Sequence, residues 1–223
     1  MKRTILLWLS LVLMVIALYL AFVYAPTEKE MGNVQRIFYL MVPMGWLAML
    51  SFTIIFIGSI FYLVKRENKW DVLAHSAAEV GIVFTTLALM IGSIWAKPIW
   101  GVWWDWGTPR LTATLVLWFI YLAYFMGRSA AAEESRGARF AAVVGIVGFV
   151  DIPIVALATT LWRGLHPGAL IFQEGGLAPP MLLAMLGGIA AYTALSALLL
   201  IQRINMRNDT TEIIRLKQLL KEI

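Results

Sequence analysis

The sequence lacks cysteine and has few charged residues. Of its 223 residues, none is cysteine, two are histidine and 14% are charged. The absence of cysteine excludes disulfide scaffolds, iron–sulfur clusters and covalent haem attachment through a CxxCH motif. A soluble domain is about 45–50% apolar and about 25% charged, whereas 61% of this chain is apolar. The composition therefore excludes a soluble enzyme and indicates an integral membrane protein.

Motifs of hydrolases and nucleotide-binding enzymes are also missing. The chain has no Walker A lysine loop, no HExxH, no GxSxG and no GxGxxG before a strand. We therefore expect that the protein is not an enzyme. The net charge of +5 does not indicate a nucleic-acid partner, because the charges lie in short clusters between apolar runs.

Six apolar runs are long enough to cross a bilayer, which requires roughly 20 residues. They predict an all-α integral membrane protein with six transmembrane helices in one domain, residues 1–205. Residues 206–223 are expected to form a separate cytoplasmic amphipathic helix, because Ile213, Leu216 and Leu220 share one helical face. The apolar runs are residues 4–24, 37–64, 73–95, 112–127, 140–161 and 179–202.

The distribution of basic residues predicts the orientation. Most of the 18 lysines and arginines lie near the two termini and in the segments after the second and fourth runs. Because cytoplasmic segments of membrane proteins are enriched in basic residues, both termini are predicted to be cytoplasmic. We expect a multi-pass protein of the plasma (inner) membrane, surrounded by lipid.

The loop between the third and fourth runs is rich in tryptophan. Five of the ten tryptophans lie within residues 95–106, and prolines and glycines interrupt the segment. We expect an aromatic platform at the extracytoplasmic surface, because such a segment does not form one regular helix face. The platform would suit a large planar ligand, with Lys97 or Arg110 available for anionic groups. The alternative is an aromatic belt with no ligand.

The two histidines cannot share a metal, because they are predicted on opposite sides of the membrane. His75 opens the third run and is expected to be solvated or interfacial. His166 lies in the last outer loop, on the side of the tryptophans, and is a candidate metal ligand. Met41, one turn into the second run, is a second candidate, since a thioether can ligate haem iron opposite histidine. Methionine in a membrane helix is more often core.

Asp151 lies in the fifth apolar run. A carboxylate within a membrane helix usually marks a function or a buried partner. We favour a structural role over a proton relay, because no chain of titratable residues continues from it. Asp151 also supports an alternative function, that of a small-solute transporter subunit. A further alternative is a structural subunit whose tryptophan loop docks a partner.

Residues 100–106, followed by Arg110-Leu111-Thr112, closely resemble the WWD signature of the haem-handling proteins of c-type cytochrome assembly. The six-span layout is similar to the cytochrome c maturation protein C (CcmC) family, and residues 38–43, 92–98 and 150–153 resemble family blocks in the same order. The resemblance implies haem b, held transiently and non-covalently at the extracytoplasmic surface. The implied haem-binding residues are Trp95, Trp100, Trp103, Trp104, Asp105, Trp106 and Arg110.

The resemblance also implies partners and axial ligands. Haem would pass to a CcmE-like chaperone, with a CcmA/CcmB ABC transporter and a small CcmD-like subunit driving release. The family's second axial histidine falls on His166, and its first falls where this chain has Met41. The iron is then held by His166 with Met41, by one protein ligand, or by another group. For the His–Met pair we expect a higher haem potential than in a bis-histidine relative.

Overall fold

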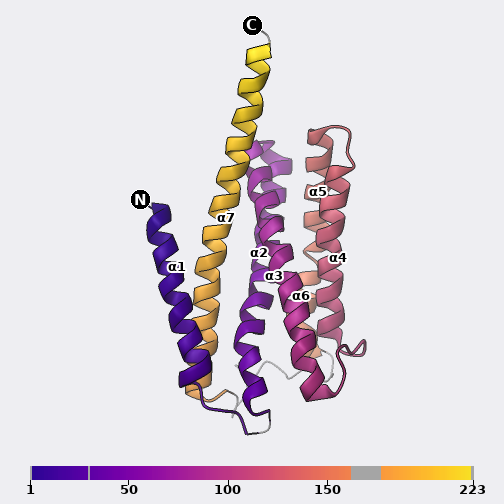
Figure 1. The fold of residues 1–223 in the computed structure, drawn as a ribbon. Coiled ribbons are helices and arrows are strands. Elements are labelled where there is room, and N and C mark those ends of the chain that lie inside the picture. Colours follow the sequence, from indigo (N-terminus) through magenta and orange to yellow (C-terminus); the bar gives the residue numbers. More distant parts are fainter. Residues whose placement is uncertain (1, 30, 162–176, 222–223) are drawn as a thin grey trace.

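The computed structural model describes residues 2–29, 31–161 and 177–221, and this part of the chain is built of helices (Figure 1). Six of its helical segments are long and apolar enough to span a membrane, which confirms the predicted all-α, six-span class. The elements are α1 (Lys2–Tyr19), η1 (Leu20–Tyr24), η2 (Asn33–Ile37), α2 (Phe38–Lys65), α3 (Asn68–Trp100), α4 (Pro109–Ser129), α5 (Glu134–Gly148), α6 (Asp151–Leu161) and α7 (Pro179–Lys221).

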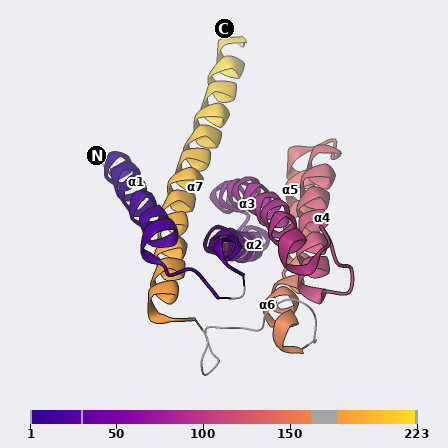
Figure 2. The ribbon, with the colours of Figure 1, turned by 60° about the horizontal axis from the view of Figure 1, so that its bottom comes forward.

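The helices α2 and α3 pack along each other at the centre of the bundle. At one edge α1 packs on α7, and at the other α4 packs on α5 and α6 (Figures 1 and 2). The start of α1 and the end of α7 point towards the same end of the bundle, and the α3–α4 loop lies at the opposite end. The arrangement agrees with termini on one side of a membrane. Which side this is remains a prediction from the charge pattern.

The core lies between α2, α3, α4 and α5. Phe52 and Leu117 are fully buried there, and the ring of Tyr121 packs edge-on against Phe52 with centroids 4.8 Å apart. The Tyr121 hydroxyl donates a hydrogen bond to the Ala48 carbonyl at 3.1 Å. This contact crosses from α4 to α2 and satisfies a polar group that would be costly to bury alone.

Arg36 ties η2 to the end of η1. Its guanidinium donates to the carbonyls of Ala21, at 3.0 Å, and of Phe22, and to the Thr27 hydroxyl at 3.4 Å. Carbonyls in the last turn of a helix have no partner within the helix. The side chain of Arg36 therefore satisfies this helix end and fixes the connection that leads into α2.

Helix α3 is longer than the predicted run of residues 73–95, and this corrects the expected loop boundary. It continues to Trp100, so Trp95 and Trp100 lie on the helix rather than in the loop. Pro98 is in the last turn and cannot donate to the Ile94 carbonyl, and the helix ends only two residues later, at Trp100. The helix ends at Gly101, which has a φ of +77° and whose N–H donates to the Lys97 carbonyl at 3.0 Å.

The fifth span is interrupted, whereas the sequence predicted one run over residues 140–161. It begins at Glu134 and breaks between Gly148 and Asp151. Pro153 explains the break, because its ring conflicts with the carbonyl four residues earlier, that of Phe149, in a continuous helix. The Phe149 carbonyl instead accepts the Ile152 N–H at 3.1 Å. Asp151 is therefore the first residue of α6 and not a mid-helix residue.

Helix α7 has 43 residues and is about 65 Å long at 1.5 Å per residue. A bilayer core is about 30 Å thick, and the C-terminal part of α7 projects past the other helices (Figure 1). The segment predicted as a separate amphipathic helix continues α7 without a break as far as Lys221. Its residues Ile213, Leu216 and Leu220 are exposed. The domain boundary at residue 205 stays a prediction.

Candidate functional site

The tryptophan loop, residues 101–108, joins α3 to α4 and presents two indole rings at the surface. Trp103 is 59% exposed and Trp106 is 71% exposed. Trp104 is only partly exposed, and its ring meets Trp106 edge-on with centroids 5.6 Å apart. Large aromatic side chains are costly to expose to water, so these rings form an apolar surface suited to a planar ligand or to lipid.

Asp105 holds the turn that presents these rings. Its carboxylate accepts hydrogen bonds from the Gly107 N–H at 3.1 Å and from the Thr108 hydroxyl at 2.6 Å. Aspartate commonly fixes a turn by accepting from the backbone two residues further on. The Thr112 hydroxyl adds a hydrogen bond to the Trp106 carbonyl at 3.2 Å. The geometry therefore gives Asp105 a positioning role within the loop.

Trp95 and Trp100 lie on the last two turns of α3. Their rings meet edge-on, with centroids 5.3 Å apart and an interplanar angle of 83°. Trp100 is partly exposed, but Trp95 is only 3% exposed. The structure thus buries Trp95, unlike Trp103 and Trp106. A haem-binding role for either residue remains a prediction.

Two cations flank the loop in different settings. The Lys97 ammonium donates to the Gly101 carbonyl at 2.8 Å and so caps the end of α3. Arg110 lies in the first turn of α4 and is partly buried, and the described residues offer it no ion pair. A cation at a helix N-terminus is opposed by the helix dipole. Of these two cations, Arg110 is therefore the one that is available to bind an anion.

Met41 lies one turn into α2, at the end of the bundle that holds the tryptophan loop. Its sulfur faces α3 at Gly92, where an added Cβ would lie 3.6 Å from the Met41 Sδ. Gly92 is one turn from Trp95 on the same helix. The structure therefore brings Met41 close to the turn of α3 that carries Trp95. His166 lies outside the described residues, so both predicted iron ligands stay predictions.

Asp151 also belongs to this end of the bundle, which the sequence did not predict. It lies only 8% exposed, and its Oδ2 has no hydrogen-bond partner in the described structure. Together with the tryptophan loop it lines a recess of about 340 Å³ between α4 and α6. The sequence alone does not predict that Asp151 lies near the loop. Its position depends on the break in the fifth span, after which α6 begins at Asp151. The recess is lined by Trp106, Gly107, Pro109, Thr112, Ala113, Val116, Asp151 and Ile154.

The opposite end of the bundle carries one buried and one partly exposed ion pair that sequence reasoning also missed. Asp71 on α3 pairs with Arg128 on α4 through two hydrogen bonds of 2.6 and 2.7 Å. Glu79 pairs with Arg203 of α7 and lies 3.5 Å from His75 Nε2. His75 is only 7% exposed, so the expectation of a solvated or interfacial histidine was wrong. The rings of Tyr124 and Phe125 on α4 pack against His75.

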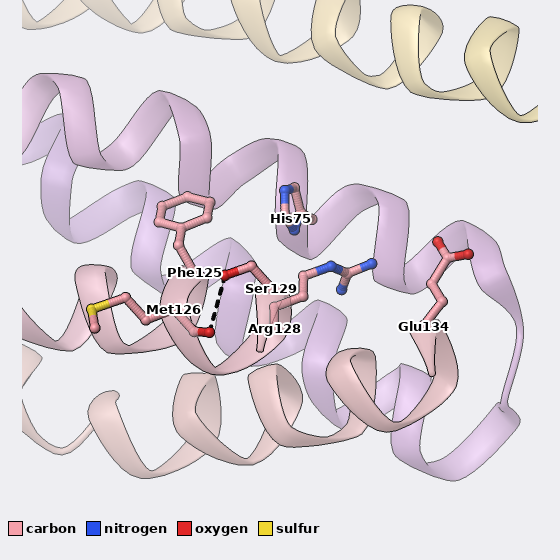
Figure 3. A pocket seen from close by; sticks show the side chains of 6 residues that line it. All are labelled: His75, Phe125, Met126, Arg128, Ser129 and Glu134. Carbon is pink, nitrogen blue, oxygen red and sulfur yellow. Dashed lines mark hydrogen bonds between the residues drawn. The ribbon is translucent and has the colours of Figure 1, made fainter. Parts of the chain in front are cut away.

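A cavity of about 450 Å³ lies beside these pairs (Figure 3). The Ser129 hydroxyl donates to the Met126 carbonyl at 3.1 Å on one wall. Because Arg128 is already paired with Asp71, the polar lining serves to hold helices together. The cavity is therefore part of a structural charge cluster, at the end of the bundle away from the tryptophan loop. Its lining residues are His75, Phe125, Met126, Arg128, Ser129 and Glu134.

Comparison with known proteins decides the family. The family model described as Heme exporter protein C matches residues 2–218 of this chain. The chain belongs to the heme exporter protein C family. The resemblance predicted from the tryptophan loop is thereby confirmed.

Several curated proteins named Heme exporter protein C are similar to the chain over most of its length. One from Bradyrhizobium diazoefficiens is 37% identical over 172 residues, which cover 76% of this chain and 65% of the relative. One from Haemophilus influenzae is 32% identical over 201 residues, covering 89% and 81%. One from Escherichia coli K12 is 32% identical over 199 residues, covering 89% and 80%. The heme exporter protein C similarity thus includes the tryptophan loop, the helices around it and most of the bundle.

Proposed function

We propose that this protein binds haem b at the extracytoplasmic surface of the inner membrane and delivers it to a CcmE-like haem chaperone during c-type cytochrome biogenesis. The observation that carries the proposal is the pair of exposed indoles, Trp103 and Trp106, on a loop held by Asp105. Membership of the heme exporter protein C family supports haem as the planar ligand.

The residues at the loop suit haem as a transient cargo. Indole faces provide apolar area for the porphyrin, and Arg110, without an ion pair among the described residues, suits a propionate. The chain has no cysteine, so attachment is non-covalent. Met41 and His166 are the proposed axial ligands. Two ligands on separate segments can open in turn, which suits release of the cargo.

The proposed role is delivery and not catalysis. We infer that a CcmA/CcmB-like ABC transporter and a small CcmD-like subunit supply the energy for release. The outward position of the loop is supported by the basic residues gathered at the termini and in the loops on their side.

The absorption spectrum of the detergent-purified protein, oxidised and reduced, tests the proposal. We expect a Soret band with reduced α and β bands, lost or shifted in His166→Ala. Each indole on the porphyrin contributes about 1 kcal/mol, so the Trp103→Ala/Trp106→Ala double variant should bind haem about thirtyfold more weakly. Trp8→Ala, an exposed tryptophan on α1, is the matched control and should retain haem.

Two outcomes would contradict the proposal. One is that the wild-type protein takes up no haem even when haem is added back. The chain would then share the fold of its family but not haem binding, and a transporter subunit centred on Asp151 would be the better explanation of its function. If the double variant retains haem with the affinity of the wild type, the tryptophan loop docks a partner and does not hold the cargo.

A further inference from the structure

The recess between α4 and α6 holds the buried carboxylate of Asp151, whose Oδ2 has no hydrogen-bond partner among the described residues. We propose that this recess binds the primary ammonium group of a membrane phospholipid, with Asp151 as the anionic ligand and Trp106 as an aromatic wall. The recess shares Trp106 with the proposed haem platform, but its ligand is a cation bound by Asp151, and the proposal does not depend on haem binding.

The electrostatics of Asp151 call for a cation. The residue is nine-tenths buried, its Oδ2 makes no hydrogen bond, and no described lysine or arginine forms an ion pair with it. A buried carboxylate without a partner is costly, and an ionisable residue at membrane depth usually marks a functional site or pairs with another group. The cation must come from outside the described chain.

The walls of the recess favour a primary ammonium. Trp106 presents a largely exposed indole, whose face attracts a cation. Thr112 also lines the recess, and its hydroxyl proton is directed to the Trp106 carbonyl, which leaves the oxygen lone pairs free to accept. A primary ammonium has three N–H donors and can serve carboxylate and hydroxyl together. A quaternary ammonium has none.

The position of the recess points to lipid as the source. One wall is the tryptophan loop and another is the first two turns of α4, so the recess lies at the level where tryptophan meets the membrane surface. Val116 and Ile154 also line the recess and are exposed apolar side chains. They offer apolar contacts for the acyl chain of a lipid whose headgroup reaches Asp151.

Native mass spectrometry of the purified full-length protein tests the proposal. It is titrated with phosphatidylethanolamine, phosphatidylcholine and phosphatidylglycerol of identical acyl chains. We expect phosphatidylethanolamine to bind at least about fivefold more tightly than the other two, since it alone offers charge-assisted N–H donors. Asp151→Asn should abolish the preference. Asp209→Asn, which removes an exposed carboxylate on α7, is the matched control and should retain it.

A second series uses the wild-type protein alone, so a folding defect in Asp151→Asn would not decide the result. Successive N-methylation of phosphatidylethanolamine should weaken binding stepwise as N–H donors are lost. Equal binding across the methylation series would overturn the proposal, and so would a preference that survives in Asp151→Asn. A carbodiimide cross-link from Asp151 to a lysine of another protein would also overturn it, because the cation would then belong to a partner helix.

Discussion

Glu79 on α3 accepts two hydrogen bonds from Arg203 on α7, at 2.7 and 2.6 Å, through both carboxylate oxygens. Arg207, one turn further along α7, donates to the same carboxylate at 2.9 Å. Three charge-assisted hydrogen bonds therefore fix α7 against α3 at the end of the bundle where α7 leaves the other helices. Glu79 therefore contributes to the register of the longest helix, which also packs on α1 and α2.

Glu79→Gln should destabilise the protein. The amide keeps the size of the side chain but leaves two arginines without their counter-charge, and hydrogen bonds to charged groups contribute about 1–3 kcal/mol. We expect a loss of that size in the free energy of unfolding, measured in detergent by thermal or denaturant unfolding. Glu67→Gln is the control, because Glu67 forms an exposed ion pair with Lys69. Equal losses of unfolding free energy in the two variants would contradict the proposed role of Glu79 in stabilising the packing of α7 on α3.

The buried pair of Asp71 and Arg128 lends itself to a double-mutant cycle. Removing one partner of a buried pair leaves an uncompensated charge and costs about 3–5 kcal/mol. We expect Arg128→Met and Asp71→Leu each to lower the unfolding free energy by that order. The double variant Asp71→Leu/Arg128→Met should recover most of the loss, since no charge is stranded. Additive losses in the double variant would show that the pair is not the source of the effect.

Gly81 is required by the packing of Tyr121. A Cβ at Gly81 would collide with the Tyr121 hydroxyl and would lie 2.8 Å from the Ser51 Cβ. Gly81→Ala should therefore displace Tyr121 and break its hydrogen bond to Ala48, and overpacking of this kind costs about 1–3 kcal/mol. Gly45→Ala is the control, because nothing lies within 4 Å of its added Cβ. A drop in melting temperature confined to Gly81→Ala checks the prediction.

The sequence predicted the spans well because their signal is local. Long apolar runs and clustered lysine and arginine determine the number of helices and their alternation, without knowledge of distant contacts. Two errors were also local. The third run was ended at residue 95, although α3 continues through Pro98 to Trp100, and Pro153 was not read as a break before Asp151.

The long-range pairs could not be predicted from the sequence. Asp71 meets Arg128 across 57 positions, and Glu79 meets Arg203 across 124. Such partners depend on which helix faces are in contact, and hydrophobicity leaves that open in a membrane, since lipid and core are equally apolar. The same holds for Asp151 and Trp106, which share a recess only because α6 packs on α4. The tryptophan motif could be recognised in the sequence, but the contacts that the surrounding helices make with it could not.

The turn held by Asp105 should control how firmly haem is retained. Asp105→Ala removes the acceptor of both the Gly107 N–H and the Thr108 hydroxyl. We expect the loop to loosen and haem content to fall severalfold, with an altered tryptophan emission spectrum. Asp105→Asn keeps one acceptor and should be intermediate. Glu133→Gln changes a carboxylate in an exposed pair at the other end and serves as control. Unchanged haem content in Asp105→Ala would assign the loop's order to other contacts.

The reduction potential of bound haem distinguishes Met41 as a ligand from Met41 as packing. A thioether opposite histidine favours ferrous iron and raises the potential relative to two histidines. If Met41 ligates the iron, Met41→His should lower the potential, strengthen ferric binding and shift the oxidised spectrum towards a bis-histidine form. Met41→Leu should keep the packing against Gly92 and lose one axial ligand. A redox titration of the three proteins decides the matter, because a residue that only packs between α2 and α3 would leave potential and spectrum unchanged in Met41→His.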